Sequence, residues 1–303
     1  MKSLHKFTNE QISKAAQNVR KRALRFTIDL GGCYLGQTCS SAEILAALYM
    51  RVLHIGESLG SPEAAEFPGA PGPGRNPDRG GLYNGPATDG YDRFFISPPH
   101  YSVAVYSTLA ECGRISPDAI EYFNKDGWNM EMIGAEHSPG FENMGGSLGQ
   151  TISIAAGTAH ARKLKGESGR VVTLITDGEM EEGQIWEAVQ AAVRYKLDNF
   201  VVYVDVNGQQ CEGPTKNIMD IELEDFARRF EAFGAVTVVV DGHDIDDLAA
   251  AADTPHPGKP LVVVCRTSCT TGIPMLESKR PNLHFISFGG GELEQIEAFY
   301  AQM

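Results

Sequence analysis

In the second half of the chain, apolar runs typical of strands take turns with stretches of helical spacing. Short runs rich in Val, Ile and Leu predict buried strands at 171–176, 200–206, 235–240 and 261–266. Apolar residues at helical spacing between these runs predict helices at 183–196, 223–233 and 245–252. Repeated β-α-β order predicts an α/β fold, with a doubly wound parallel sheet and helices on both faces.

The first half of the chain predicts mainly helices. Thr8 and Gln11 form a capping-box pattern before a helix that ends near Asp29, and a second helix is expected over Ser41–His54. Further helices are expected at 101–111, 116–125, 148–164 and, near the end of the chain, 291–302. Residues 56–90 have no period and are crowded with Pro and Gly, which favours a surface insertion and leaves a lid or partner-docking loop as the alternative. We therefore predict a single domain over 1–303 that carries this insertion.

Composition narrows the classes of partner. The 303 residues carry a formal net charge of −13, which disfavours nucleic acid and anionic membrane surfaces. No apolar run has the length of a membrane span, and the N-terminus lacks the apolar core of a signal peptide. Six cysteines without a CxxC pair favour reduced thiols and a cytoplasmic location.

Two polar residues directly follow neighbouring predicted strands. Asp177 follows the run VVTLIT and Asn207 follows FVVYVDV, so both are expected at the carboxyl edge of the sheet. A carboxylate and a carboxamide are hard oxygen ligands that suit Mg²⁺ or Ca²⁺, and a turn at Gly208 lets the main-chain carbonyl of Gln209 join them. Gly178 and the start of the next helix would receive a phosphate.

Each motif also has a simpler interpretation. Asp-Gly and Asn-Gly are common turn sequences after strands, and only their equal positions on neighbouring strands make the pair specific. Glu181 and Glu182 are expected to complement a helix dipole. A metal-dependent phosphatase would also place an Asp at a strand end, but it wants a second Asp where this chain has Glu179.

The segment that joins the two motifs resembles a known cofactor signature. TDGEMEEGQIWEAVQAAVRYKLDNFVVYVDVNGQQCEG is similar to the thiamine-diphosphate motif, and most similar to the N-terminal half of transketolase as found in split, two-subunit transketolases. The segments DRFFISPPHYS, GFENMGGSLGQ and VDGHD follow the same family order, so the resemblance covers nearly the whole chain.

The resemblance implies a set of site residues. It implies metal binding by Asp177, Asn207 and the main chain of Gln209. It implies catalytic roles for His100 and His284, which would contact the cofactor diphosphate or the substrate oxygen. The implied contacts with thiamine diphosphate are His100, Gly146, Leu148, Asp177, Gly178, Glu179, Asn207 and His284.

The chain also departs from the family pattern. Tyr34 stands where transketolases carry a His, and another substrate-contacting His aligns near Met132, with His137 as a neighbouring substitute. Losing imidazoles removes polar contacts to a sugar, so these positions leave the substrate open. The first Gly of the motif is Thr176, a mild change at the end of a strand.

The resemblance implies that half of the enzyme lies on another chain. The family's catalytic Glu belongs to a second, pyrimidine-binding domain that is not found here. We therefore expect an α2β2 heterotetramer with a C-terminal-half transketolase-like subunit. The expected activity is transfer of a two-carbon ketol unit from a ketose or 2-oxo acid to an aldehyde or a carrier-bound acceptor. The alternatives are an E1-type subunit of a 2-oxo-acid dehydrogenase, with a carrier protein as partner, and a non-catalytic cofactor-binding subunit.

Overall fold

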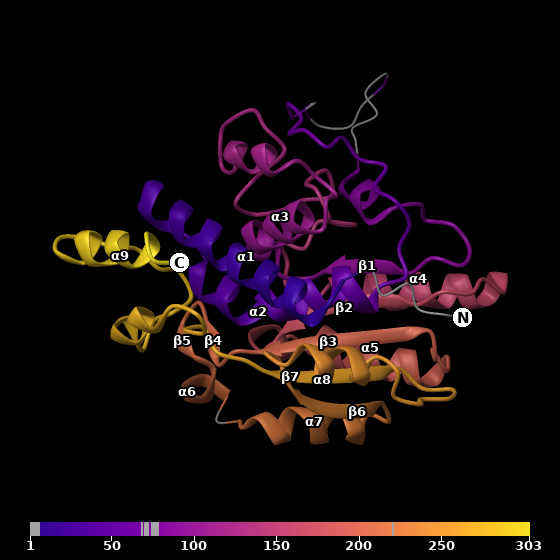
Figure 1. Cartoon of the computed structure of the whole chain (residues 1–303). Coiled ribbons are helices and arrows are strands. Elements are labelled where there is room, and N and C mark those ends of the chain that lie inside the picture. The colour runs from indigo at the N-terminus through magenta and orange to yellow at the C-terminus, as the bar shows by residue number, and fades with distance from the viewer. Residues whose placement is uncertain (1–6, 68, 70–72, 74–78, 220) are drawn as a thin grey trace.

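A parallel sheet forms the centre of the protein (Figure 1). The structure is a computed structural model that describes residues 7–67, 69, 73, 79–219 and 221–303. Within these residues, five strands are hydrogen-bonded in the order β1-β2-β3-β7-β6, and every pair of neighbours is parallel. The strands are β1 (Arg93–Ile96), β2 (Val171–Thr176), β3 (Phe200–Val206), β6 (Val236–Asp241) and β7 (Leu261–Arg266).

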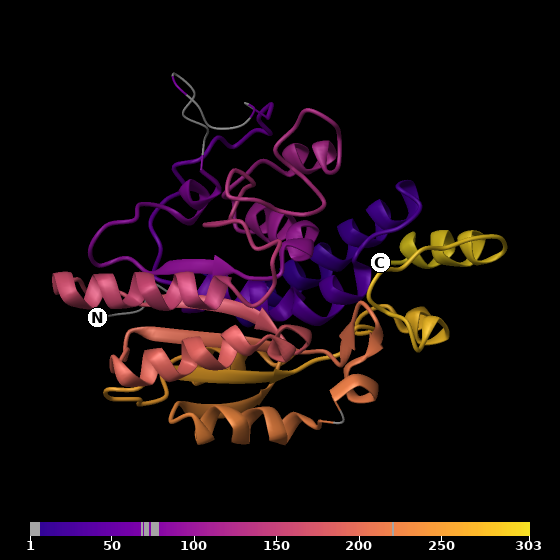
Figure 2. The ribbon, with the colours of Figure 1, turned by 180° about the vertical axis from the view of Figure 1, so that it is seen from behind.

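Helices cover both faces of this sheet, as predicted (Figures 1 and 2). One face carries α1 (Asn9–Asp29), α2 (Leu35–Ala47), α3 (Ser102–Glu111) and α8 (Ile245–Ala251). The opposite face, which Figure 2 brings to the front, carries α4 (Thr151–Lys165), α5 (Gly183–Arg194) and α7 (Leu223–Ala232). Successive side chains of a strand point to opposite faces, so Val201 and Tyr203 join the first core while Val202 and Val204 join the second. This two-sided burial explains the continuous apolar runs in the sequence.

Most predicted elements are confirmed, with shifts of a few residues at their ends. The strands at 171–176, 200–206 and 261–266 have the predicted bounds, and α1 begins with the predicted capping box between Thr8 and Gln11. The tail forms α9 (Glu292–Tyr300).

Two helix predictions were wrong in extent. The second helix begins at Leu35, six residues before the predicted start, and continues as a π-helix over Leu48–Val52. Every residue of α2 is buried, so it lacks the one-sided apolar stripe that marks where a surface helix begins. The helix expected at 116–125 is only a 3-10 helix, Pro117–Tyr122, and Asn124 beyond it has a φ of 56°, which an α-helix does not accommodate.

Short elements near the sheet edges escaped prediction. Strand β1 has four residues, and the hairpin of β4 (Gln209–Gln210) and β5 (Gly213–Pro214) has two residues on each side. This hairpin leads into α6 (Thr215–Met219) at the carboxyl edge of the sheet, on the left in Figure 1. The Pro/Gly-rich stretch lies partly outside the described residues, and its described part includes a 3-10 helix at Gly80–Asn84.

The predicted placement of the two motif residues is confirmed. Strands β2 and β3 are paired in parallel, with Thr176 opposite Asp205, so Asp177 and Asn207 follow neighbouring strands at the same edge. Over the part of the chain that the structure describes, no helix is both long and apolar enough for a membrane span.

Candidate active site

Asp177 is a buried carboxylate at the end of β2. Its side chain is fully buried, and it accepts hydrogen bonds from the main-chain nitrogens of Gly178 (3.1 Å) and Gly208 (2.9 Å) and from Oγ1 of Thr215 (2.9 Å). Burial and the nearby charge of Asp205 raise the pKa of Asp177 to about 7. Within the described residues no Lys, Arg or His forms an ion pair with this carboxylate.

Asn207 and Gln209 bring further oxygen atoms to the same edge. Asn207 Oδ1 accepts a hydrogen bond from the main-chain nitrogen of Gln209 at 2.9 Å, which leaves this oxygen a second lone pair. Both residues are largely buried. No group of three or more His, Cys, Asp or Glu side chains suited to a metal occurs among the described residues, so a cation here would depend on the carboxamide and main-chain oxygens as well.

A second buried acid, Asp205, was missed by sequence reasoning. Its Oδ2 accepts hydrogen bonds from Oγ of Ser40 (2.6 Å), the hydroxyl of Tyr101 (2.7 Å) and Nδ2 of Asn207 (3.2 Å). Asn207 Nδ2 also lies 3.0 Å from the Tyr101 hydroxyl. The side-chain amide of Asn207 is thereby turned toward Asp205, which orients Oδ1 the other way. A charged residue inside the apolar run FVVYVDV was the available signal.

Three predicted residues from distant parts of the sequence form one ring cluster. The ring centroids of Tyr34 and His100 are 5.0 Å apart, those of His100 and His284 are 5.0 Å apart, and those of Tyr34 and His284 are 5.4 Å apart. Tyr34 therefore lies beside both histidines. Tyr101 directly follows His100 and lies within hydrogen-bond distance of Asn207. It therefore connects the ring cluster to the acid pair, Asp177 and Asp205.

Main-chain contacts hold the cluster together. Cys33 and Ile286 exchange two backbone hydrogen bonds, of 3.0 and 2.9 Å, which place Tyr34 beside the segment of His284. A Cβ added to Gly36 would lie 2.1 Å from the carbonyl oxygen of Leu283, so only glycine allows this close approach. The main-chain nitrogen of Leu283 also donates to the side chain of Gln209 at 3.0 Å. Gln209, one of the candidate metal ligands, is thus tied to the residue before His284.

Both histidines of the cluster are held in the neutral form. Burial and the neighbouring His284 lower the pKa of His100 to about 3. Burial also lowers the pKa of His284, although Glu212 opposes this effect. A neutral imidazole carries one donor and one acceptor nitrogen, so each ring can donate a single hydrogen bond in a defined direction.

The Gly-rich turn before α4 is fastened to the end of β2 by Glu179. The buried Glu179 carboxylate accepts hydrogen bonds from the Ser97 hydroxyl, from the main-chain nitrogen of Gly149 (3.0 Å) and from that of Thr176 (3.0 Å). Both carboxylate oxygens are therefore engaged within the chain. The turn itself leaves Gly146 and Leu148 exposed, whereas Gly178 is half-buried.

Of the remaining candidates, Met132 lies beside the ring cluster, whereas His137 has other partners. The carbonyl oxygen of Met132 accepts a 2.6 Å hydrogen bond from Oγ of Ser102, two residues after His100, so this loop lies beside the cluster. The side chain of His137 instead pairs with Glu131 and packs on Phe67, with ring centroids 4.6 Å apart. The structure therefore brings Tyr34 into the ring cluster and engages His137 elsewhere.

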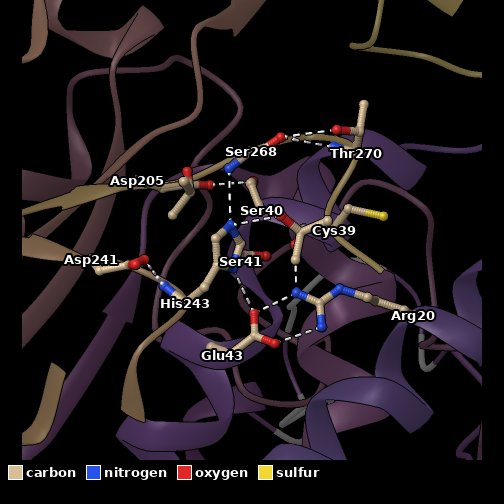
Figure 3. Close-up of polar contacts among 12 residues, drawn as sticks. Arg20, Cys39, Ser40, Ser41, Glu43, Asp205, Asp241, His243, Ser268 and Thr270 are labelled. Atoms are coloured by element: carbon tan, nitrogen blue, oxygen red, sulfur yellow. Dashed lines mark hydrogen bonds and ion pairs between the residues drawn. The ribbon is translucent and has the colours of Figure 1, made fainter. Parts of the chain in front are cut away.

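A buried ionic network links helices α1 and α2 to the loop beside the site (Figure 3). Arg20 on α1 makes a two-pronged ion pair with Glu43 on α2, and Nδ1 of His243 lies 2.9 Å from Glu43. The main-chain nitrogen of Ser268 donates to Nε2 of His243 at 3.0 Å. The Thr267 hydroxyl, one residue earlier, binds Asp205. The network thus connects two helices to the loop that follows β7 and reaches the acid pair.

A family model and several known proteins match this chain. The family described as "Transketolase, thiamine diphosphate binding domain" matches residues 82–300. A putative uncharacterized transketolase family protein of Sinorhizobium fredii is 35% identical over 92% of this chain and 91% of its own length. One subunit of the apulose-4-phosphate transketolase of Actinobacillus succinogenes is 30% identical over 94% of both chains. A 6-deoxy-6-sulfo-D-fructose transketolase subunit of a Clostridium species is 31% identical over 87% of both chains.

Solved structures extend the likeness to the fold. The transketolase of Campylobacter jejuni superposes with a TM-score of 0.74 at 23% identity, over 97% of this chain but only 43% of that enzyme. The chain therefore spans less than half the length of that transketolase. This chain belongs to the transketolase family and carries its thiamine-diphosphate-binding domain. Its similar proteins include two that are named as transketolase subunits.

Proposed function

We propose that this chain is the diphosphate- and Mg²⁺-binding subunit of a thiamine-diphosphate-dependent transketolase-like transferase. The enzyme would move a two-carbon ketol unit from a ketose or 2-oxo acid donor to an aldehyde or carrier-bound acceptor. The observation that carries the proposal is the buried carboxylate of Asp177, which pairs with no Lys, Arg or His of the described residues, at the sheet edge that also bears Asn207 and the ring cluster.

The oxygen donors fit a hard divalent cation. Asp177 would give a carboxylate oxygen, Asn207 its Oδ1 and Gln209 its main-chain carbonyl, a set that suits Mg²⁺ or Ca²⁺. A bound cation would offset the burial that raises the pKa of Asp177, because an opposite charge favours the ionised carboxylate. Asp177, Asn207 and Gln209 would hold the cation, and its charge would attract the diphosphate of the cofactor to this edge of the sheet.

Other residues of the chain would orient the cofactor and substrate. Thiamine diphosphate, when bound, supplies the carbanion chemistry. His100 and His284, both neutral, would donate hydrogen bonds to oxygens of the diphosphate or the substrate. Gly146 and Leu148 would lie against the aminopyrimidine ring, and Glu179 would contribute by holding their turn in place.

A second subunit would complete the site. Two similar proteins are named as transketolase subunits and match this chain over most of their own length, which supports a partner that carries the pyrimidine-binding half and its Glu. We propose an α2β2 heterotetramer in the cytoplasm.

A ketose is the donor that we favour. Two similar proteins are named for the ketose derivatives apulose 4-phosphate and 6-deoxy-6-sulfo-D-fructose. Tyr34 lies in the ring cluster and offers a phenolic hydroxyl where a family imidazole would stand, so it would contact the donor. Met132 lies beside the cluster through its main chain, whereas His137 is already paired with Glu131.

Removal of the Asp177 carboxylate tests the cofactor site. We expect Asp177→Ala to abolish Mg²⁺-dependent binding of thiamine diphosphate, because it removes the only carboxylate of the proposed ligand set. The measurement is isothermal titration of thiamine diphosphate with Mg²⁺ into the complex of this chain with its partner. Asp253→Ala, which removes an exposed carboxylate, is the matched control and should bind as the parent does. Unchanged affinity in Asp177→Ala would refute the site assignment.

The requirement for a second subunit has its own test. We expect no two-carbon transfer from a ketose by this chain alone and turnover after the partner subunit is added, because the proton-transferring Glu would come from the partner. Product formation and the mass of the complex are measured on the same samples. Full turnover by the purified chain alone would contradict the two-subunit proposal, and cofactor binding without turnover by the complex would favour a non-catalytic subunit.

A further inference from the structure

Gln37 is a buried residue on α2 that the family pattern does not single out. It lies one turn after Tyr34, its side chain is 1% exposed, and its Nε2 lies 2.9 Å from Nδ1 of His284. We propose that Gln37 is a positioning residue that fixes the tautomer of His284, so that this ring carries its proton on Nε2.

The direction of this hydrogen bond follows from the chemistry of its two atoms. An amide nitrogen donates and does not accept, so Nδ1 of His284 must be the acceptor. Burial lowers the pKa of His284 and favours the neutral ring. A neutral imidazole with an unprotonated Nδ1 carries its proton on Nε2. The second nitrogen of His284 is therefore a donor.

The reversed orientation of the Gln37 amide is less favourable. Gln37 Oε1 is buried and has no hydrogen-bond partner among the described residues. Exchanging the two amide atoms would put an NH₂ group with two protons at that position. Buried N–H groups without a partner are rarer and more costly than carbonyl oxygens with free lone pairs. The observed orientation therefore leaves the smaller unmet demand.

The backbone of Gln37 is fixed as well. Its carbonyl oxygen accepts hydrogen bonds from Oγ of Ser40 (3.0 Å) and from Oγ of Ser41 (2.7 Å). Ser40 also binds Asp205, so Gln37 is attached to the same polar centre as Asn207. A side chain on such a rigid base can hold the imidazole in one orientation.

The consequence concerns what His284 can do. An Nε2–H donor stabilises negative charge that develops on a nearby oxygen, but it cannot take a proton from the substrate at that nitrogen. This role rests on the proposed function, whereas the tautomer does not. His284 would act as a hydrogen-bond donor beside His100 and Tyr34, and not as a general base.

Nuclear magnetic resonance of the imidazole nitrogens tests the tautomer directly. The full chain is labelled with ¹⁵N-histidine, and the ring N–H correlations are recorded at neutral pH, with His284 assigned by its absence in His284→Asn. We expect a protonated Nε2 and a bare Nδ1 in the parent. Gln37→Glu places an acceptor against Nδ1 and should move the proton there, and Gln37→Met should leave a mixture of the two tautomers.

Controls separate this effect from general damage. Gln302→Glu adds the same charge near the end of the chain and should leave the His284 pattern unchanged. Thermal unfolding reports whether each variant is folded, and the parent spectrum decides the tautomer even if a variant is not. A bare Nε2 in the parent, or an unchanged pattern in both Gln37 variants, would overturn the proposal. Cofactor titration with Asp177→Ala tests the proposed function separately, because it does not depend on the ring of His284.

Discussion

Asp177 and Asp205 are two buried acids with different hydrogen-bond partners. Main-chain nitrogens and Thr215 serve Asp177, whereas hydroxyls and the amide of Asn207 serve Asp205. Hydrogen-bond donors of the chain therefore occupy Asp205, and Asp177 is the acid that we expect to bind a cation. Sequence identified Asp177 because a turn follows it, whereas two partners of Asp205, Ser40 and Tyr101, come from more than 100 positions away.

At the residue scale, the lowered pKa of His100 predicts that the folded protein loses stability in acid. Its folded pKa is about 3 and its unfolded pKa is near 6.5, so the unfolded chain binds a proton that the folded chain refuses between these values. The contribution of the neutral ring to the free energy of unfolding is complete above pH 6.5 and is lost as the pH falls toward 3. The free energy of unfolding then falls by up to about 1.4 kcal/mol per pH unit. We expect His100→Asn to flatten the acid limb of the unfolding free energy, measured in urea between pH 7 and pH 4.

The exposed His54 provides the control for this measurement. His54→Asn should keep the acid slope of the parent. Parallel slopes for the parent and His100→Asn would mean that His100 takes up its proton in the folded state as readily as in the unfolded state.

At the scale of elements, the Gly-rich turn depends both on its own glycine and on Glu179, which follows β2. Gly149 has a φ of 81°, and a Cβ there would lie 2.7 Å from Cβ of Glu182, so the turn fits closely against the start of α5. Glu179 supplies the polar part of this contact.

Glu179→Gln tests the attachment of the turn. The new amide group must face at least one of the N–H donors that the carboxylate now serves, which leaves a buried donor unpaired. We expect the free energy of unfolding to fall by about 1–3 kcal/mol in urea denaturation. Glu181→Gln makes the same change at an exposed position and should have little effect. Equal stabilities of the two variants would show that Glu179 is not needed for the turn.

At the scale of the whole molecule, the Arg20–Glu43–His243 network joins parts of the fold that the sheet does not connect directly. Arg20 and Glu43 are both buried, so the loss of one partner leaves the other charge uncompensated. The same network positions the loop after β7, which carries Thr267 to Asp205. Damage here should therefore reach the site.

Glu43→Gln is expected to be strongly destabilising. Removing one member of a buried ion pair costs about 3–5 kcal/mol, measurable as a lower midpoint of urea unfolding. Glu224→Gln breaks an exposed ion pair with Arg266 and should change the midpoint little. A small effect of Glu43→Gln would mean that Arg20 finds another acceptor, such as the carbonyl of Cys39 that it already contacts.

The sequence by itself determined the parallel sheet, the strands β2, β3 and β7, and the pair Asp177 and Asn207. These features follow from local periodicity and from the fact that parallel strands end at one edge. The start of α2 was beyond its reach, because a helix buried on every side has no periodic stripe. The tertiary structure decided which side chains meet: Tyr34 with His100 and His284, and Gln37 with His284. Such contacts depend on close approaches between distant segments, as at Gly36 and Leu283, and no local pattern in the chain encodes them.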